Sequence, residues 1–209
     1  MKKFLLVAVI AALGAAPVAA APPTLTLKAA PTVVTYGGST TLSGTLSTAR
    51  AGQSVDIQAQ ECGQNAFKKV TTVTTTTGGA FSASVKPTIN TNYQAKQKGA
   101  TSPAVAVKVS PLLSLKKTGG VATRRFVVTL TSAQSFVGKY VVFQRRTTTR
   151  WRTVKRVTLT SVKTTVAPTQ VTSQNFAVRI KRHPRVRVVL PVTQAGTCYL
   201  PAKSAAIRS

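Results

Sequence analysis

The chain has 209 residues and a formal net charge of +27, because 29 lysines and arginines stand against only two carboxylate side chains and one histidine. General acid–base catalysis needs a group that titrates near neutral pH or a pair of carboxylates, and a calcium site needs several anionic oxygen ligands. The composition therefore argues against an enzyme and against a calcium site.

The few residues that bear catalytic or ligand chemistry also lie apart in the sequence. His183 precedes Pro184 and is interpreted as a turn residue, whereas Asp56 and Glu61 lie in the other half of the chain. Two scattered cysteines and one histidine, with no ligand pair at metal spacing, argue against zinc. We expect no catalytic residues, no metal and no cofactor.

The first 20 residues are typical of a secretory signal peptide. Lys2 and Lys3 precede an apolar stretch over residues 4–16, which is short for a membrane span. Val18 and Ala20 are small residues that predict cleavage after position 20. We expect a secreted, extracellular protein with no membrane span. The sequence leaves open whether it stays on the cell wall or is released.

The segments that follow alternate apolar and polar residues, as β-strands with one buried face do. Leu42 and Leu46 alternate with threonine and serine, and Val55 and Ile57 alternate with polar residues in the same way. Glycines and prolines separate these segments, and no long segment has the apolar stripe of an amphipathic helix. The sequence predicts an all-β protein.

An internal repeat divides the chain after the signal peptide into two units, residues 21–110 and 111–209. Each unit has about 90–100 residues and about seven short strands, the size of an immunoglobulin-like sandwich. The segment joining them, "KVSPLLSLKK", has one proline and no flexible spacer, so we expect the units to abut. The segments that match in order are 52–60 with 138–146, 67–73 with 151–157, 79–85 with 174–180 and 102–107 with 203–208.

Two long segments, "PTVVTYGGSTTLSGTLSTARAGQSVDIQAQ" and "GGAFSASVKPTINTNYQAKQKGATSPAVAVKV", resemble the bacterial immunoglobulin-like repeats of secreted and cell-surface proteins. Residues 136–204 are similar to a diverged second copy. The resemblance covers essentially all of the chain after residue 20. It implies two tandem immunoglobulin-like Greek-key β-sandwiches that serve as spacer or adhesive modules, and it brings no catalytic residues.

The immunoglobulin-like topology that this resemblance implies places both cysteines near the junction of the two units. Cys62 follows the third strand, at the end where the chain leaves the first unit. Cys198 precedes the last strand, at the end where the chain enters the second. We hypothesise that an inter-domain disulfide joins them, since an exported chain meets an oxidising environment. Two free thiols, or disulfides between molecules, remain open.

The positive charge is concentrated in the second unit. Residues 21–110 carry a net +6, whereas residues 111–209 carry +19 and have no carboxylate side chain. Strand alternation turns Val141 and Phe143 inward, so arginines at intervening positions face solvent. Trp151 is interpreted as a core or edge packing residue. The predicted anion-binding face comprises Arg146, Arg185 and Arg187, with Arg152 or Arg156 from the next strand beside them.

Arginine binds phosphate and carboxylate groups with two parallel hydrogen bonds, which favours an anionic polymer as the partner. We expect the basic second unit to hold a cell-envelope glycopolymer or an acidic polysaccharide. Sequence-specific nucleic-acid binding is not expected, because no recognition helix is predicted and few aromatic residues lie among the charges. The alternatives are a spacer or accessory subunit that binds another surface protein, and a charge that has no selected partner.

Overall fold

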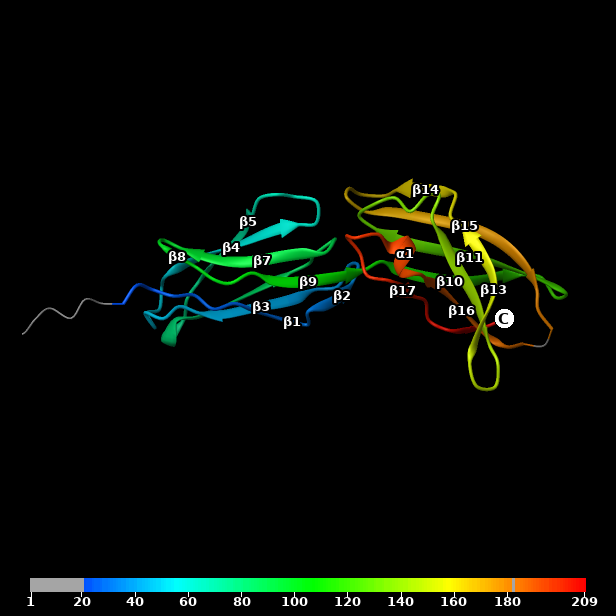
Figure 1. The fold of residues 1–209 in the computed structure, drawn as a ribbon, viewed down its shortest axis with the longest axis horizontal. Coiled ribbons are helices and arrows are strands. Elements are labelled where there is room, and N and C mark those ends of the chain that lie inside the picture. Colours follow the sequence, from blue (N-terminus) through cyan, green and yellow to red (C-terminus); the bar gives the residue numbers. More distant parts are fainter. Residues whose placement is uncertain (1–20, 182) are drawn as a thin grey trace, which may run out of the picture.

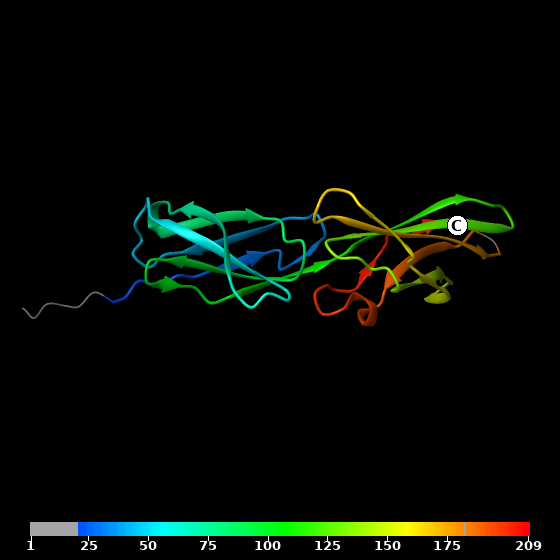
Figure 2. The same ribbon diagram turned by 90° about the horizontal axis from the view of Figure 1, so that it is seen from above.

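The computed structural model describes residues 21–181 and 183–209, so the predicted signal peptide lies outside the described residues. Within this range the chain forms β-strands joined by turns, with one four-residue helix, α1 (Val192–Ala195), and one 3-10 turn, η1 (Thr77–Gly79). The predicted all-β fold class is therefore confirmed. The strands form two groups that lie end to end (Figures 1 and 2). We call residues 21–110 the first half and residues 111–209 the second half.

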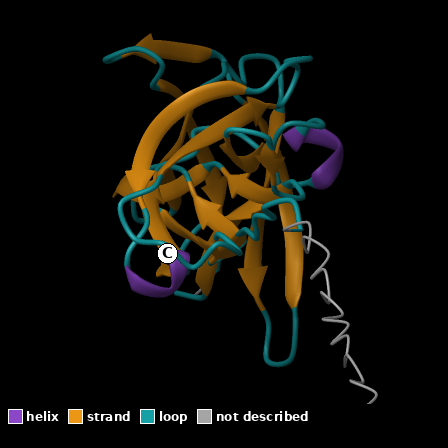
Figure 3. Ribbon diagram, turned by 90° about the vertical axis from the view of Figure 1, so that its left-hand side faces the viewer, coloured by secondary structure: helices purple, strands orange, loops and turns teal. Residues whose placement is uncertain are grey.

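Two sheets of the first half enclose its core, and Figure 3 views them from that end of the molecule. One is antiparallel, in the order β1-β3-β6. The other has the order β2-β9-β7-β4-β5, with β8 paired to β7 and with β2 parallel to β9. The strands are β1 (Lys28–Ala30), β2 (Val33–Thr35), β3 (Thr40–Thr45), β4 (Ser54–Glu61), β5 (Lys68–Thr74), β6 (Ala80–Val85), β7 (Thr91–Gln97), β8 (Ala100–Thr101) and β9 (Val105–Ser110).

The second half also has two sheets, and all of their strand pairs are antiparallel. Their orders are β10-β11-β15-β14 and β13-β12-β16-β17, with β18 paired to β16. In the described part of the chain, each sheet takes its strands from one half. The strands are β10 (Leu112–Gly119), β11 (Thr123–Ser132), β12 (Tyr140–Arg146), β13 (Trp151–Thr158), β14 (Ser161–Thr164), β15 (Gln170–Arg179), β16 (Arg185–Leu190), β17 (Ala202–Lys203) and β18 (Ile207–Arg208).

Alternate strand positions fill the core of the first half, as the sequence pattern predicts. Leu42 and Leu46 are almost fully buried. Gly44 lies between them, and its lack of a side chain makes room for Phe81. A Cβ at Gly44 would lie 2.5 Å from the Phe81 ring and 2.0 Å from the carbonyl oxygen of Thr26. Glycine is therefore required there by close packing.

The core of the second half is built around three phenylalanines. Phe126, Phe143 and Phe176 pack with ring centroids 5.1–5.6 Å apart. Val141 and Phe143 are fully buried, which confirms the predicted inward face of β12. Aromatic pairs in such tilted and offset arrangements stabilise a core beyond the area that they bury.

A disulfide joins the two halves. Cys62, directly after β4, is bonded to Cys198, which lies between α1 and β17, with 5.4 Å between the two Cα atoms. This confirms the hypothesised pairing of the two cysteines. Neither cysteine is left as a free thiol.

Backbone and amide hydrogen bonds surround the disulfide. The backbone N–H of Asn90 donates to the carbonyl of Cys198 at 3.1 Å, and its side-chain Nδ2 donates to the carbonyl of Thr197 at 3.2 Å. The Asn90 Oδ1 in turn accepts from the N–H of Val109 at 2.8 Å. The Val109 carbonyl accepts from the N–H of Leu200. One buried asparagine thus holds segments from both halves together.

Tyr199 makes a second connection across the junction. Its hydroxyl donates to the carbonyl of Thr88 in the first half at 2.8 Å and accepts from the N–H of Ala133 in the second at 2.9 Å. Burial raises the pKa of Tyr199 to about 12, because the phenolate form would lose its hydration. The junction between the halves is therefore held by a covalent bond and by partly buried hydrogen bonds.

Candidate anion-binding face

Three neighbouring strands of the second half place arginines on one outward face of their sheet. In β12, Arg146 points away from the core, one position out of phase with Arg145. Arg185 and Arg187 alternate with the buried Val186 and therefore point to the same side of β16. The β12–β13 hairpin, whose turn is at residues 147–150, projects from the body of the second half (Figure 1). The structure thus brings Arg146 to the same face as Arg185 and Arg187, which are far from it in the sequence.

Trp151 is the platform on which two of these arginines lie. It is half-buried on the edge strand β13, directly opposite Arg146, rather than within the core. The guanidinium carbon of Arg187 lies 4.2 Å from the centre of the Trp151 ring, and that of Arg146 lies 5.8 Å from it. Cation–π contacts of this kind attract a guanidinium to the face of the ring.

Arg187 is further positioned by a hydrogen bond and by its charge environment. Its Nε donates to the Oε1 of Gln144 on β12 at 3.0 Å. Partial burial lowers the pKa of Arg187, and the positive charge of Arg146 lowers it further. Two guanidinium groups held near each other repel, and an anion between them would relieve that repulsion.

Arg156 extends this arrangement along β13. It pairs with Val142 across the sheet, on the outward face, and its guanidinium carbon lies 5.1 Å from the centre of the Tyr140 ring. Two aromatic rings on adjacent strands therefore each hold an arginine. Of the two candidates from this strand, Arg156 is the one that shares the face.

Arg152 lies on the reverse side of the hairpin. It pairs with Arg145, which is out of phase with Arg146, so both point to the opposite side of the sheet. The pairing of β12 with β13 shifts by one residue between Phe143 and Gln144, where β13 accommodates one extra residue. This bulge places Arg152 and Arg156 on opposite sides of the sheet. Side-chain spacing along an isolated strand does not reveal such a bulge.

Two further basic residues join the face from the last strands of the chain. Arg208 pairs with Arg185, and Lys203 pairs with Val189, which is in phase with Arg187. Both are exposed. The sequence repeat marked residues 203–208 as a strand. Only the pairing of β17 and β18 with β16 shows that Lys203 and Arg208 lie on this face. We call Arg146, Arg156, Arg185, Arg187, Lys203 and Arg208 the basic face.

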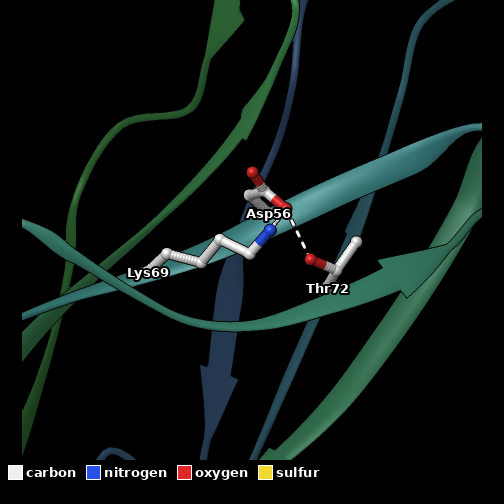
Figure 4. Close-up of polar contacts among 3 residues, drawn as sticks. All are labelled: Asp56, Lys69 and Thr72. Atoms are coloured by element: carbon white, nitrogen blue, oxygen red, sulfur yellow. Dashed lines mark hydrogen bonds and ion pairs between the residues drawn. The ribbon is translucent and has the colours of Figure 1, made fainter.

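The corresponding face of the first half carries paired polar side chains instead. The Lys69 Nζ lies 3.0 Å from the Asp56 Oδ1, and the Thr72 hydroxyl donates to the same oxygen at 2.6 Å (Figure 4). The hydrogen bond from Thr72, followed by that from Lys69, lowers the pKa of Asp56. Among the residues that the structure describes, this is the only ion pair of the protein.

The strand registers make the two faces directly comparable. Gln58 pairs with Gln94 between β4 and β7, and Gln144 pairs with Arg187 between β12 and β16. Both pairs are hydrogen-bonded, at 2.8 and 3.0 Å. By the same registers and the sequence repeat, the arginines stand where the first half has neutral side chains: Arg146 for Gln60, Arg156 for Thr72, Arg185 for Asn92 and Arg187 for Gln94.

The residues considered for catalysis or metal binding are not gathered at one site. Asp56 contacts Lys69 and Thr72, as described above. His183 lies by Arg124, whose Nη1 is 3.2 Å from its Nδ1, and by the carbonyl of Ser209. Over residues 21–181 and 183–209, no group of three or more His, Cys, Asp and Glu side chains is arranged to hold a metal ion.

No protein-family model matches the sequence, and comparison with curated proteins finds no significant match. In the described part of the chain, no helix is both long enough and apolar enough to cross a membrane.

Proposed function

We propose that the protein is an exported, non-enzymatic pair of immunoglobulin-like β-sandwiches, residues 21–110 and 111–209, whose basic face binds an anionic polymer of the cell envelope or its surroundings. The strand orders support the fold assignment, because both halves place non-consecutive strands side by side in two sheets, as Greek-key sandwiches do. The disulfide supports export, since such bonds persist in oxidising compartments.

The observation that carries the binding proposal is the exchange of neutral residues for arginines at equivalent positions of the two halves. The first half shows that the sheet folds with three amides and a threonine at these four positions. Four arginines on one face raise its self-repulsion, and the second half has no carboxylate side chain to offset it. Their common orientation is therefore explained by an external anion.

The stacked geometry also favours binding by arginine. Arg187 and Arg156 lie over Trp151 and Tyr140, which restricts their rotamers before any ligand arrives. A guanidinium held in this way loses less conformational entropy on binding. Gln144 occupies the Nε of Arg187, so its two terminal nitrogens are the pair that would meet phosphate or carboxylate oxygens. Many such contacts along a polymer give binding that weakens steeply with salt.

The test compares two fourfold variants that lose the same charge. R146Q/R156Q/R185Q/R187Q removes the stacked and neighbouring arginines, whereas K116Q/K117Q/R125Q/R179Q neutralises four exposed residues of the other sheet. Binding to polyphosphate, polygalacturonate and double-stranded DNA is measured over about 0.05–0.3 M salt. We expect the first variant to lose polymer binding at physiological salt. For polyphosphate, the negative slope of log K against log salt should become shallower by about 3, because four charge contacts are lost. Equal losses in both variants would show that only net charge matters and would refute the proposal.

A further inference from the structure

Two guanidinium groups of the basic face share one aromatic ring. The guanidinium carbons of Arg187 and Arg146 lie 4.2 Å and 5.8 Å from the centre of the Trp151 ring. Arg146 is directly opposite Trp151 in the β12–β13 pair, whereas Arg187 comes from β16, on the other side of β12. The side chain of Trp151 therefore reaches across β12, and three strands contribute to one cluster.

This cluster concentrates positive charge that the second half cannot neutralise. Residues 111–209 contain no carboxylate side chain. Besides partial burial, the charge of Arg146 lowers the pKa of Arg187, so the two guanidinium groups repel each other. Arg185 lies two positions before Arg187 on the same strand and pairs with Arg208, which adds further positive charge. A negative charge at this place must therefore come from outside the second half.

Contacts within the sheet determine which part of each arginine can meet an anion. The Nε of Arg187 donates to the Oε1 of Gln144 at 3.0 Å, so its two terminal nitrogens form the remaining edge. Two parallel N–H donors on such an edge match two oxygens of a phosphate or carboxylate group. Arg146 is exposed and can turn its own N–H groups toward the same anion. The cluster thus offers two guanidinium edges to one ligand.

The charge of the cluster favours a doubly charged group over a singly charged one. A carboxylate, or a phosphodiester within a chain, carries one negative charge and neutralises only one of the two guanidinium groups. A phosphomonoester carries roughly 1.5–2 negative charges at pH 7 and has three acceptor oxygens. It can therefore neutralise both charges and accept hydrogen bonds from both edges.

We propose that Arg146, Arg187 and Trp151 form a subsite for a phosphomonoester group at an end or on a branch of the anionic polymer. This inference rests on the proposed function and specifies the group that the basic face recognises. Arg187 supplies the fixed pair of donors, Arg146 supplies the second charge, and Trp151 is the platform for both. The other arginines of the basic face contact the singly charged remainder of the polymer.

Trp151 makes the subsite directly observable, because it is the only tryptophan of the chain. Its fluorescence is measured in the full chain at constant ionic strength, during titration with glycerol 3-phosphate, dimethyl phosphate and galacturonate. We expect a saturable change with glycerol 3-phosphate and at least about tenfold weaker binding of the two singly charged ligands. Equal binding of all three ligands, or no binding at all, would overturn the proposal.

Hexathymidylate with and without a 5′-phosphate tests the source of the group. The two oligomers have the same phosphodiester backbone and differ only in the terminal phosphomonoester. We expect the phosphorylated oligomer to bind about tenfold more tightly. Inorganic phosphate should bind more weakly than this oligomer, because it makes no contact with the rest of the basic face. Equally tight binding of inorganic phosphate would assign the site to the free ion and refute a polymer group as the ligand.

Substitutions at the two arginines separate the geometry of the subsite from its charge. Arg187→Lys keeps the positive charge but lacks the paired N–H edge, whereas Arg146→Gln removes one charge. We expect each substitution to weaken binding of the phosphorylated oligomer about tenfold and to reduce its advantage over the unphosphorylated one. Isothermal titration supplies the affinities where a substitution changes the fluorescence of Trp151. An undiminished advantage in both variants would contradict the assignment.

The control is the fourfold variant of the other sheet, K116Q/K117Q/R125Q/R179Q. It loses more charge than either single variant and should keep the full preference for the terminal phosphate. A comparable loss of preference in this control would show that net charge alone decides binding, and the subsite would be refuted.

The salt series with polyphosphate separates this proposal from the proposed function. A parent protein that holds polyphosphate at physiological salt without preferring the terminal phosphate would retain the basic face and lose the subsite. A parent that prefers the terminal phosphate but releases polyphosphate below physiological salt would support the subsite and refute polymer binding by the wider face.

Discussion

Removing the disulfide should lower the stability of the whole chain by a calculable amount. Cys62 and Cys198 are separated by 136 residues in the sequence, so their bond closes a very long loop in the unfolded state. In the chain-entropy description, a cross-link over such a loop stabilises the fold by about 5 kcal/mol. For a protein of this size, each 1 kcal/mol shifts the unfolding midpoint by about 2–4 °C. We expect C62S/C198S to unfold about 10–20 °C below the parent.

This magnitude requires that both halves unfold together. The hydrogen bonds of Asn90 and Tyr199 across the junction support such coupling, because the segments that hold them come from both halves. If the halves unfold separately, calorimetry will resolve two transitions in C62S/C198S where the parent shows one.

The assay is differential scanning calorimetry of the parent and of C62S/C198S, each with and without reductant. The reduced parent should match the double variant, and reductant should leave the double variant unchanged. A double variant that unfolds in a single transition within about 2 °C of the unreduced parent, a difference below about 1 kcal/mol, would refute the reasoning. It would mean that the bond constrains neither the unfolded chain nor the docking of the halves.

Three further predictions concern the junction and the cores. Because the pKa of Tyr199 is raised from 10.0 to about 12, its stabilising effect is complete below pH 10 and is lost as the pH rises through 12. Between about pH 9 and pH 11, the free energy of unfolding in urea should therefore fall less for Tyr199→Phe than for the parent. An equal fall in both proteins would contradict this. Gly44→Ala should destabilise by at least about 1–3 kcal/mol in urea titration, since its Cβ would overlap the Thr26 carbonyl, and an unchanged midpoint would contradict the packing. Phe126→Ala should cost about 3–5 kcal/mol by the same measurement, and a cost below about 1 kcal/mol would show that the phenylalanine cluster does not hold the second half together.

Local pattern was sufficient for the faces of β12 and β16, and so for three residues of the candidate site, Arg146, Arg185 and Arg187. Because side chains alternate strictly along a strand, the burial of Val141 and Phe143 follows from their order in the sequence. The common side of Arg185 and Arg187 follows in the same way. The pairing of Cys62 with Cys198, which the structure shows, was only a hypothesis from the immunoglobulin-like topology that the family resemblance implies, with free thiols and disulfides between molecules left open.

What the sequence by itself determined is therefore the class of structure, the inward and outward sides of the regularly alternating strands, and a second half whose charge cannot be neutralised from within. The tertiary structure alone decided which strands meet and in what register. The bulge in the β12–β13 pair selected Arg156 over Arg152, and the docking of β18 on β16 added Arg208. Register and crossing are set by contacts between distant segments, so no local periodicity encodes them.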